Sequence, residues 1–214
     1  VKISHGHWCC LSGVEQSRCC GTTMFSLSKP SPEAIRAFLS AQADRELFYE
    51  QVGASRTTAP NGYVVDHNRV QLGVGRAVFE RAMNAVRHWK MFDMTWLELC
   101  WPNVPIETGA TVAVMVRHLG FWSLNACRIV YTIEESGMVE KHGFAYGTLP
   151  DHSEMGEERF SVEFHAENET VWYDVYAFSR PRPLARLAHP YTRALQKRFA
   201  EDSKKAMKRA VESA

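Results

Sequence analysis

Ionisable side chains are concentrated in one stretch between two segments of strand composition, HGFAYGTLPDHSEMGEERF (142–160). His152 beside a carboxylate of this stretch could move a proton, because a neighbouring carboxylate tunes the pKa of an imidazole towards working pH. His152 with Glu157 or Glu158 also offers nitrogen and oxygen ligands to a metal ion. Such a metal site would need further ligands from remote positions such as His67 or His142. The stretch therefore has two chemical interpretations, acid–base catalysis and metal binding.

A structural interpretation of the same stretch competes with both. A glutamate in this loop would accept hydrogen bonds from backbone N–H groups or pair with an arginine, and would thereby stabilise the end of the sheet. The arginines considered as partners are Arg69, Arg76 and Arg128. We expect this structural role for Glu157 or Glu158, and we keep His152, Glu157 and Glu158 as catalytic candidates.

Aromatic and polar residues around this stretch are candidates for contact with a bound molecule. The sequence GFAYG puts Phe144 and Tyr146 on one strand face, and Gly147 allows a bulge or a close backbone approach where the strand ends. The residues predicted to bind a ligand are Tyr146, Thr148, His152, Arg76, Trp96 and Tyr176.

Motifs that carry a known reaction are missing from the sequence. There is no G-x-S-x-G, no H-E-x-x-H and no Walker loop. The run GVGRAVF lacks the third glycine of a dinucleotide-binding loop, and Cys100 and Cys127 stand in apolar segments where a thiol packs as a small hydrophobe. We therefore predict no cofactor and no metal, and the question of an enzymatic activity stays open.

The first residues of the chain are rich in cysteine and histidine. They could hold zinc, although adjacent cysteines direct two thiolates at one metal less well than C-x-x-C does, and the segment has no hydrophobic period. The side chains concerned are His5, His7, Cys9, Cys10, Cys19 and Cys20. We expect residues 1–23 to be a disordered extension. The alternative is that they belong to the sequence only because the start site is placed too early, in which case Met24 is the natural first residue. Residues 24–214 are then expected to form a single domain.

Composition excludes several classes of protein. Of the 214 residues, 45% are hydrophobic and 23% are charged, which is ordinary for a globular protein. The formal net charge of +1 gives no general attraction to nucleic acid, so we predict no nucleic-acid partner. No uncharged apolar run of about 18 residues occurs, and the start of the chain lacks a signal peptide's apolar centre. A cytoplasmic location is the expectation.

Hydrophobic periodicity predicts a helix, a strand, a second helix and then a run of strands. Ser31 is a suitable N-cap with Pro32 at the first helical position, and a second helix is expected after Gly75. Branched and aromatic residues recur in short segments between Met94 and Arg180, separated by turn signals. Consecutive strands with short connections indicate an antiparallel sheet, so the fold class is α+β.

A long helix is predicted at the end of the chain, beginning at Pro190. One face is apolar and its opposite face is mostly basic. The basic residues are Arg193, Lys197, Arg198, Lys204, Lys205, Lys208 and Arg209. We interpret the basic face as solvated, and the alternative is an anionic membrane surface or an acidic partner.

This element order resembles the helix-grip fold of the START-like or SRPBCC superfamily. In that fold an antiparallel sheet wraps around a long C-terminal helix and leaves an apolar cavity between them. The resemblance implies a protein that binds a lipid, a sterol or another apolar molecule.

Several longer motifs resemble a narrower group, the domain-of-unknown-function family nineteen-ninety, whose members come from bacteria and plants. Some plant members are labelled outer envelope proteins. The resemblance runs from about Phe25 to Val211 and implies no reaction. The motifs are DHNRVQLGVG (66–75), HWKMFDMTW (88–96), GFAYGTLPDHSEMGEERF (143–160), VWYDVYAFSRP (171–181) and HPYTRALQKRF (189–199).

These observations together predict a domain that binds an apolar or amphipathic small molecule, or a lipid, between the sheet and the last helix. One alternative is an enzyme that uses His152, Glu157 and Glu158 on such a ligand. The other is a membrane-surface protein that docks through the basic helix, which we do not favour. The sequence leaves the oligomeric state open.

Overall fold

The structure is a computed structural model that describes residues 25–101, 103–181 and 189–212. The cysteine-rich start, with its zinc alternative and the expected disordered extension, lies outside the described residues. The helices are α1 (Pro32–Gln42), α2 (Arg76–Arg87) and α3 (His189–Glu212), with short 3-10 turns η1 (Ala54–Arg56) and η2 (Lys90–Phe92). The strands are β1 (Phe25–Ser26), β2 (Val64–Val74), β3 (Leu97–Cys100), β4 (Thr111–Arg117), β5 (Trp122–Glu135), β6 (Val139–Thr148), β7 (Glu154–His165) and β8 (Thr170–Pro181).

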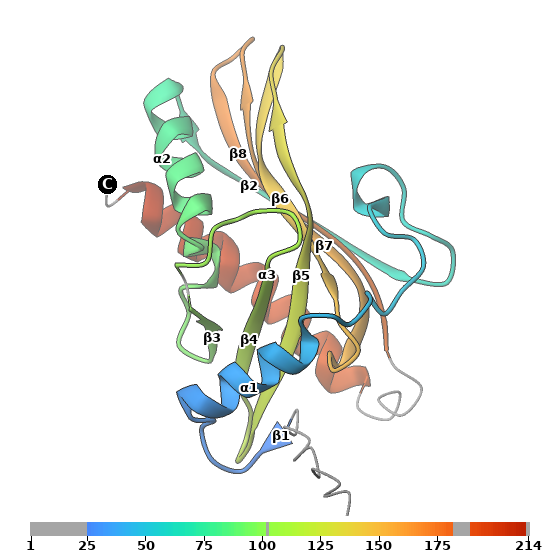
Figure 1. Ribbon diagram of the computed structural model, residues 1–214. Coiled ribbons are helices and arrows are strands. Elements are labelled where there is room, and N and C mark those ends of the chain that lie inside the picture. The colour runs from blue at the N-terminus through green and yellow to red at the C-terminus, as the bar shows by residue number, and fades with distance from the viewer. Residues whose placement is uncertain (1–24, 102, 182–188, 213–214) are drawn as a thin grey trace, which may run out of the picture.

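All strands belong to one sheet, and its neighbouring strands run antiparallel as the sequence predicts. The order across the sheet is β2-β8-β7-β6-β5-β4-β3, and the short β1 pairs with β5. Consecutive strands from β3 to β8 are neighbours, while β2 reaches the far edge and pairs with β8. Figure 1 shows this curved sheet with α3 crossing one of its faces. The predicted α+β class and the helix-grip arrangement are confirmed.

The stretch 142–160 is mostly strand, which corrects the prediction that Glu154, Glu157 and Glu158 lie in a loop between two strands. β6 continues to Thr148 and β7 begins at Glu154, so the connecting turn contains only residues 149–153. Cross-strand pairing joins Tyr146 to Glu158 and Gly147 to Glu157. Glu157 is buried and bound by Tyr49, and the half-buried Glu158 is bound by Tyr146, which composition alone does not reveal.

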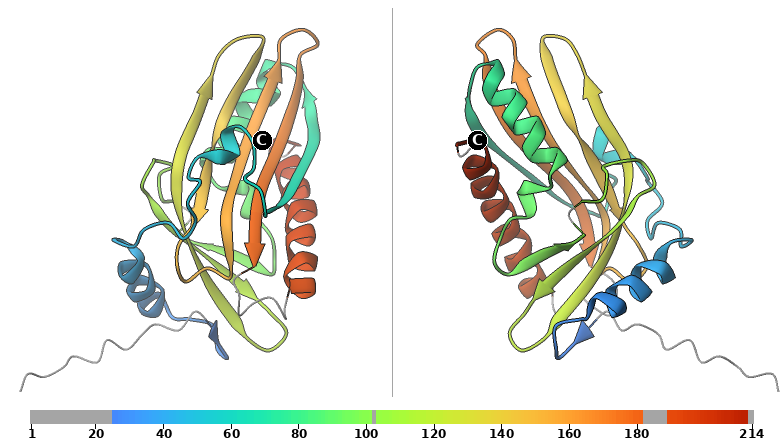
Figure 2. Two further views of the ribbon diagram at one scale, coloured as in Figure 1. Left: turned by 90° about the vertical axis from the view of Figure 1, so that its right-hand side faces the viewer. Right: turned by 60° about the vertical axis from the view of Figure 1, so that its left-hand side comes forward.

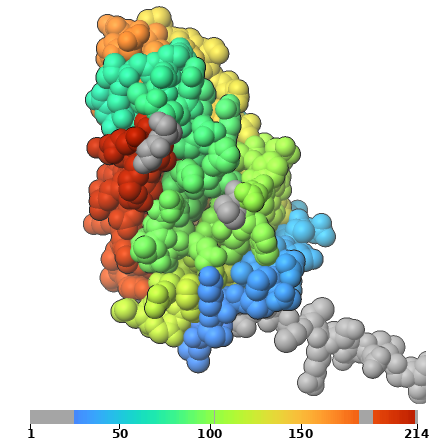
Figure 3. Space-filling view, turned by 90° about the vertical axis from the view of Figure 1, so that its left-hand side faces the viewer, coloured from blue at the N-terminus to red at the C-terminus, as the bar shows by residue number. Residues whose placement is uncertain are grey.

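α2, α3 and η2 cover one face of the sheet. Aromatic rings fill the space beneath them, with Phe92 at 5.5 Å from both Phe160 and Phe199, measured between ring centroids. Figure 3 shows α2 and α3 side by side on this side of the molecule. α3 presents Phe199, Met207 and Val211 to this core, in agreement with the apolar face predicted for it.

The opposite face is covered by α1 and by the chain between α1 and β2. Ser31 caps α1 as predicted, accepting the backbone N–H of Ala34 at 3.2 Å. Phe38 of α1 packs with buried side chains of β4 and β5. Further along, Tyr49 and Tyr63 lie edge-on against Phe178 of β8, and Figure 2 shows this segment crossing the sheet.

The charged side chains of α3 are partly paired along the helix. Lys204 binds Glu201 at 2.7 Å, and Lys205 and Arg198 both approach Asp202, at 3.4 and 3.5 Å. None of the helices in the described ranges is long and apolar enough to cross a membrane.

Candidate functional site

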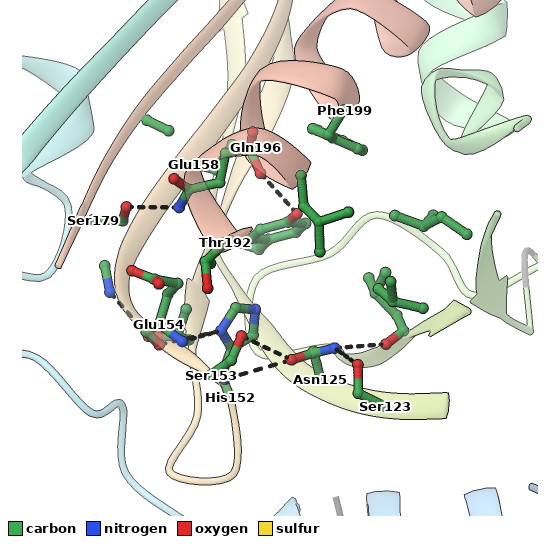
Figure 4. A pocket seen from close by; sticks show the side chains of 18 of the residues that line it. Ser123, Asn125, His152, Ser153, Glu154, Glu158, Ser179, Thr192, Gln196 and Phe199 are labelled. Carbon is green, nitrogen blue, oxygen red and sulfur yellow. Dashed lines mark hydrogen bonds between the residues drawn. The ribbon is translucent and has the colours of Figure 1, made fainter. Parts of the chain in front are cut away.

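A cavity of about 180 Å³ lies between the sheet and the N-terminal half of α3. Figure 4 shows α3 on one side of it, β5 on another and the β6–β7 turn beside both. One part of the wall is apolar, formed by Phe92, Trp96, Leu97, Val114, Val116, Leu195 and Phe199. The other part is polar and includes Ser123, Asn125, Thr148, His152, Ser153, Glu154, Glu158, Ser179 and Gln196. A molecule that matched this wall would be amphipathic.

The apolar wall is fixed by contacts outside the cavity. Trp96 donates its indole N–H to Asp202 of α3 at 3.0 Å, and the guanidinium of Arg198 lies 4.6 Å from the Trp96 ring centroid. Because an indole that is hydrogen-bonded and stacked has little rotational freedom, this part of the wall is preformed.

Most of the polar wall is satisfied by its own hydrogen bonds. Asn125 donates to Ser123 at 3.1 Å and accepts from the backbone N–H of Ser153 at 3.4 Å. Gln196 of α3 donates to Ser179 at 3.0 Å. Nδ1 of His152 lies 3.0 Å from the backbone nitrogen and 3.1 Å from the carbonyl oxygen of Glu154, so the tautomer of the ring decides which of the two it binds.

Glu158 lies on the cavity side of β7 and is half-buried. It accepts a hydrogen bond from the hydroxyl of Tyr146 at 2.9 Å. Burial raises the pKa of Glu158 to about 7, although the hydrogen bond from Tyr146 acts in the opposite direction. The negative charge of Asp66 makes a smaller contribution that also raises this pKa. A carboxyl with that pKa can either donate or accept a proton near neutral pH.

Glu154 is the exception among the polar groups of the wall. Its side chain is buried, and both carboxylate oxygens lack a hydrogen-bond partner in the described part of the chain. Burial raises the pKa of Glu154 to about 7, although the positive charge of Arg193 acts in the opposite direction. Arg193 itself is committed to Asp66, which it binds through both terminal nitrogens.

Glu157 borders the cavity, but its carboxylate is held on the opposite face of β7. It accepts hydrogen bonds from the Tyr49 hydroxyl and the Gly53 N–H, both at 2.7 Å, and from the N–H and hydroxyl of Ser55. This is the structural role expected of a glutamate here. Successive residues of a strand point to opposite faces, so Glu157 and Glu158 serve different sides of the sheet.

The arginines considered as glutamate partners bind other groups. Arg69 pairs with Glu163 and Asp174, and Arg128 donates to main-chain carbonyls at the end of α1 and just beyond it. Arg76 forms a two-pronged pair with Glu140, at 2.7 and 2.5 Å. No arginine is therefore needed to explain the position of Glu157.

Four of the six residues predicted to bind a ligand line the cavity, namely Trp96, Tyr146, Thr148 and His152. Arg76 and Tyr176 are not among its lining residues. Arg76 is occupied by Glu140, and Tyr176 lies on the other face of β8 with its ring 5.5 Å from that of His67. Sequence reasoning missed Glu154, Asn125 and Gln196 as wall residues, and no local motif marks them.

The residues considered as metal ligands do not meet. His67 binds Asp174 at 2.6 Å and His142 lies 3.2 Å from Glu134, so each has a separate partner. Within the described ranges no three histidine, cysteine, aspartate or glutamate side chains are grouped to hold a metal ion.

Comparison with solved structures finds proteins of similar chain path. They include Ara h 8.0201, with a TM-score of 0.46 and 13% identity over 72% of this chain and all of that one. Another is norcoclaurine synthase from Thalictrum flavum in complex with dopamine and hydroxybenzaldehyde, with a TM-score of 0.43 and 10% identity over 78% of this chain and 95% of that one. At such identities and TM-scores the likeness does not extend to activity.

Comparison with sequences identifies closer relatives. A UPF0548 protein of Dictyostelium discoideum is 33% identical over 210 residues, which cover 89% of this chain and 97% of the relative. A UPF0548 protein of Deinococcus radiodurans is 35% identical over 200 residues, covering 88% and 99%. The family model described as "Domain of unknown function (DUF1990)" matches residues 48–206. The chain belongs to the DUF1990 family.

Proposed function

We propose that the protein binds a small amphipathic molecule in the cavity between the sheet and α3. The observation that carries the proposal is the two-sided wall, with aromatic and aliphatic side chains on one side and polar groups on the other. Ligand sites in proteins commonly have this construction, an apolar lining with a few placed polar groups.

The volume of the cavity favours a compact ligand. An apolar cavity of about 150 Å³ is enough to hold benzene, and this one measures about 180 Å³. It therefore suits a molecule built on about one ring better than it suits a sterol or a long acyl chain. Of the apolar partners expected from the sequence, the small molecule is favoured over the lipid.

Titration with benzyl alcohol, a neutral single-ring probe, tests this function. We expect the methyl resonances of Val114, Val116 and Leu195 to shift, because these side chains line the cavity. Methyl resonances of Ile133, which belongs to a separate cluster, serve as the control. Shifts of equal size at Ile133, or none at the three wall residues, would contradict binding in the cavity.

A cavity-filling variant completes the experiment. Val114→Phe adds a ring to the apolar wall, so it should abolish the probe-dependent shifts at Val116 and Leu195. Overpacking typically costs about 1 to 3 kcal/mol, so a thermal melt should accompany the titration to show that the variant is folded. Probe binding that survives in folded Val114→Phe would place the site elsewhere.

A further inference from the structure

The acidic residues of the cavity wall indicate the charge of its ligand. Four acidic residues line the cavity, Asp66, Glu154, Glu157 and Glu158, although the carboxylate of Glu157 is held on the other face of β7. No lysine or arginine is found among the lining residues that the structure describes, and the two histidines are His118 and His152. A concave site with this imbalance has a negative potential, which favours a cation over an anion.

Two of the four carboxylates already have partners that account for them. Asp66 is neutralised by the two-pronged contact with Arg193, and the carboxylate of Glu157 is bound by Tyr49, Gly53 and Ser55 on the other face of β7. Glu154 and Glu158 remain as the acidic groups available to a ligand.

Glu154 is the stronger indication of the two. Its side chain is 5% exposed and both of its oxygens are buried with no partner among the described residues. The neighbouring polar groups do have partners, such as Asn125 with Ser123 and Gln196 with Ser179. A buried acceptor without a donor costs free energy, and a donor supplied by a ligand would remove that cost.

We propose that the cavity selects a small organic cation, a compact amine with about one ring, and that Glu154 is its counter-ion. Glu158 adds negative potential from the same strand, while the ring of the ligand packs against Phe92, Val114 and Phe199. This inference rests on the proposed function and specifies the chemical class of its ligand.

The binding of such an amine should depend on pH, because only ionised Glu154 can pair with it. The charge of Arg193 on α3 acts on Glu154. The other charged and titratable residues that line the cavity are His118 after β4, His152 on the β6–β7 turn, Asp66 on β2, and Glu157 and Glu158 on β7. Since burial raises the pKa of Glu154 to about 7, amine affinity should fall as the pH is lowered through about 7. Alkyl amines stay protonated over this range, so the ligand's own charge does not change.

Three probes of equal size test the inference with the full chain, namely benzylamine, benzyl alcohol and benzoate. At about pH 8 and low salt, we expect benzylamine to bind on the order of tenfold more tightly than benzyl alcohol, and benzoate more weakly than both. In Glu154→Gln the benzylamine affinity should fall to that of benzyl alcohol, while benzyl alcohol stays within about threefold. Glu201→Gln, an exposed carboxylate of α3 paired with Lys204, is the control that should change neither affinity.

The outcomes separate the two proposals. Benzyl alcohol binding at least as tightly as benzylamine in the parent protein would overturn the amine inference and leave the proposed function standing. A preference for benzylamine that persists in Glu154→Gln would show that Glu154 is not the counter-ion, and would also overturn it. If none of the probes shifts the wall methyl groups, the proposed function itself fails.

Discussion

Replacing Glu157 by glutamine should destabilise the protein strongly. Its two carboxylate oxygens serve four donors, and two of these are the backbone N–H groups of Gly53 and Ser55, at 2.7 and 2.9 Å. A hydroxyl can reverse its role and accept a hydrogen bond, but a backbone N–H cannot. The amide nitrogen of glutamine would therefore face one of these N–H groups and leave it without an acceptor.

The size of the loss follows from that count. An unsatisfied buried donor costs about 1 to 3 kcal/mol, and the remaining bonds lose the strength that a charged acceptor gives them. We expect a total of about 2 to 4 kcal/mol, which corresponds to a fall in melting temperature of roughly 5 to 15 °C for a protein of this size.

The assay consists of thermal melts and urea titrations of the parent protein, Glu157→Gln and Glu98→Gln. Glu98→Gln is the matched control, because Glu98 has the same side chain in a half-exposed pair with Lys29 and should change stability by less than about 1 kcal/mol. If Glu157→Gln melts within about 2 °C of Glu98→Gln, the hydrogen bonds to Glu157 do not hold the 49–55 segment, and the reasoning is wrong.

Three further changes test other parts of the structure. Burial raises the pKa values of Glu154 and Glu158 from 4.5 to about 7, so the folded state binds these protons more tightly than the unfolded state does. Their contribution to the free energy of unfolding is therefore highest below about pH 4.5 and declines as the pH rises to about 7. In urea titrations, the free energy of unfolding of Glu154→Gln should decline less over this pH range than that of the parent protein. A Cβ atom on Gly147 would lie 2.1 Å from the Tyr49 hydroxyl oxygen, so Gly147→Ala should lower the melting temperature, whereas the double variant with Tyr49→Ala should melt no lower than Tyr49→Ala alone. Ser31→Ala removes the N-cap of α1 and should cost about 1 kcal/mol in a urea titration; no change would mean that the cap is dispensable.

Helices and strands were predictable where residues close together in the sequence determine them. Ser31 followed by Pro32 marks the start of α1, and the alternation of Phe160, Val162 and Phe164 marks a strand with one buried face. These signals depend on residues a few positions apart, so they can be interpreted without knowing the packing.

The ends of β6 and β7 were harder to predict because Gly147 and the glutamates have the composition of a loop. In the structure Gly147 is inside the sheet, where the absence of a side chain leaves room for Tyr49 to reach Glu157. That requirement comes from a residue almost a hundred positions earlier in the chain. Composition identifies a special backbone position but not whether a turn or a tight contact needs it.

The site was predictable only in part for the same reason. Tyr146, Thr148 and His152 were chosen because aromatic and polar residues cluster near a strand end, and they line the cavity together with Trp96. Tyr176 was expected to bind a ligand but is not among the lining residues, since β8 carries aromatic residues on both faces and only the register with β2 and β7 decides which one meets the cavity.

Glu154 shows why the unpredicted residue is the informative one. Its neighbours in the wall form hydrogen bonds that stabilise the folded state, so their presence can be explained by structure alone. An unpaired buried carboxylate has the opposite effect at neutral pH, because its burial disfavours the ionised form that water would stabilise. Groups that lower stability are found mainly where function requires them. The same reasoning separates Glu154 from Glu157 on one strand: removing Glu157 should weaken the fold, whereas removing Glu154 should strengthen it at neutral pH and weaken amine binding.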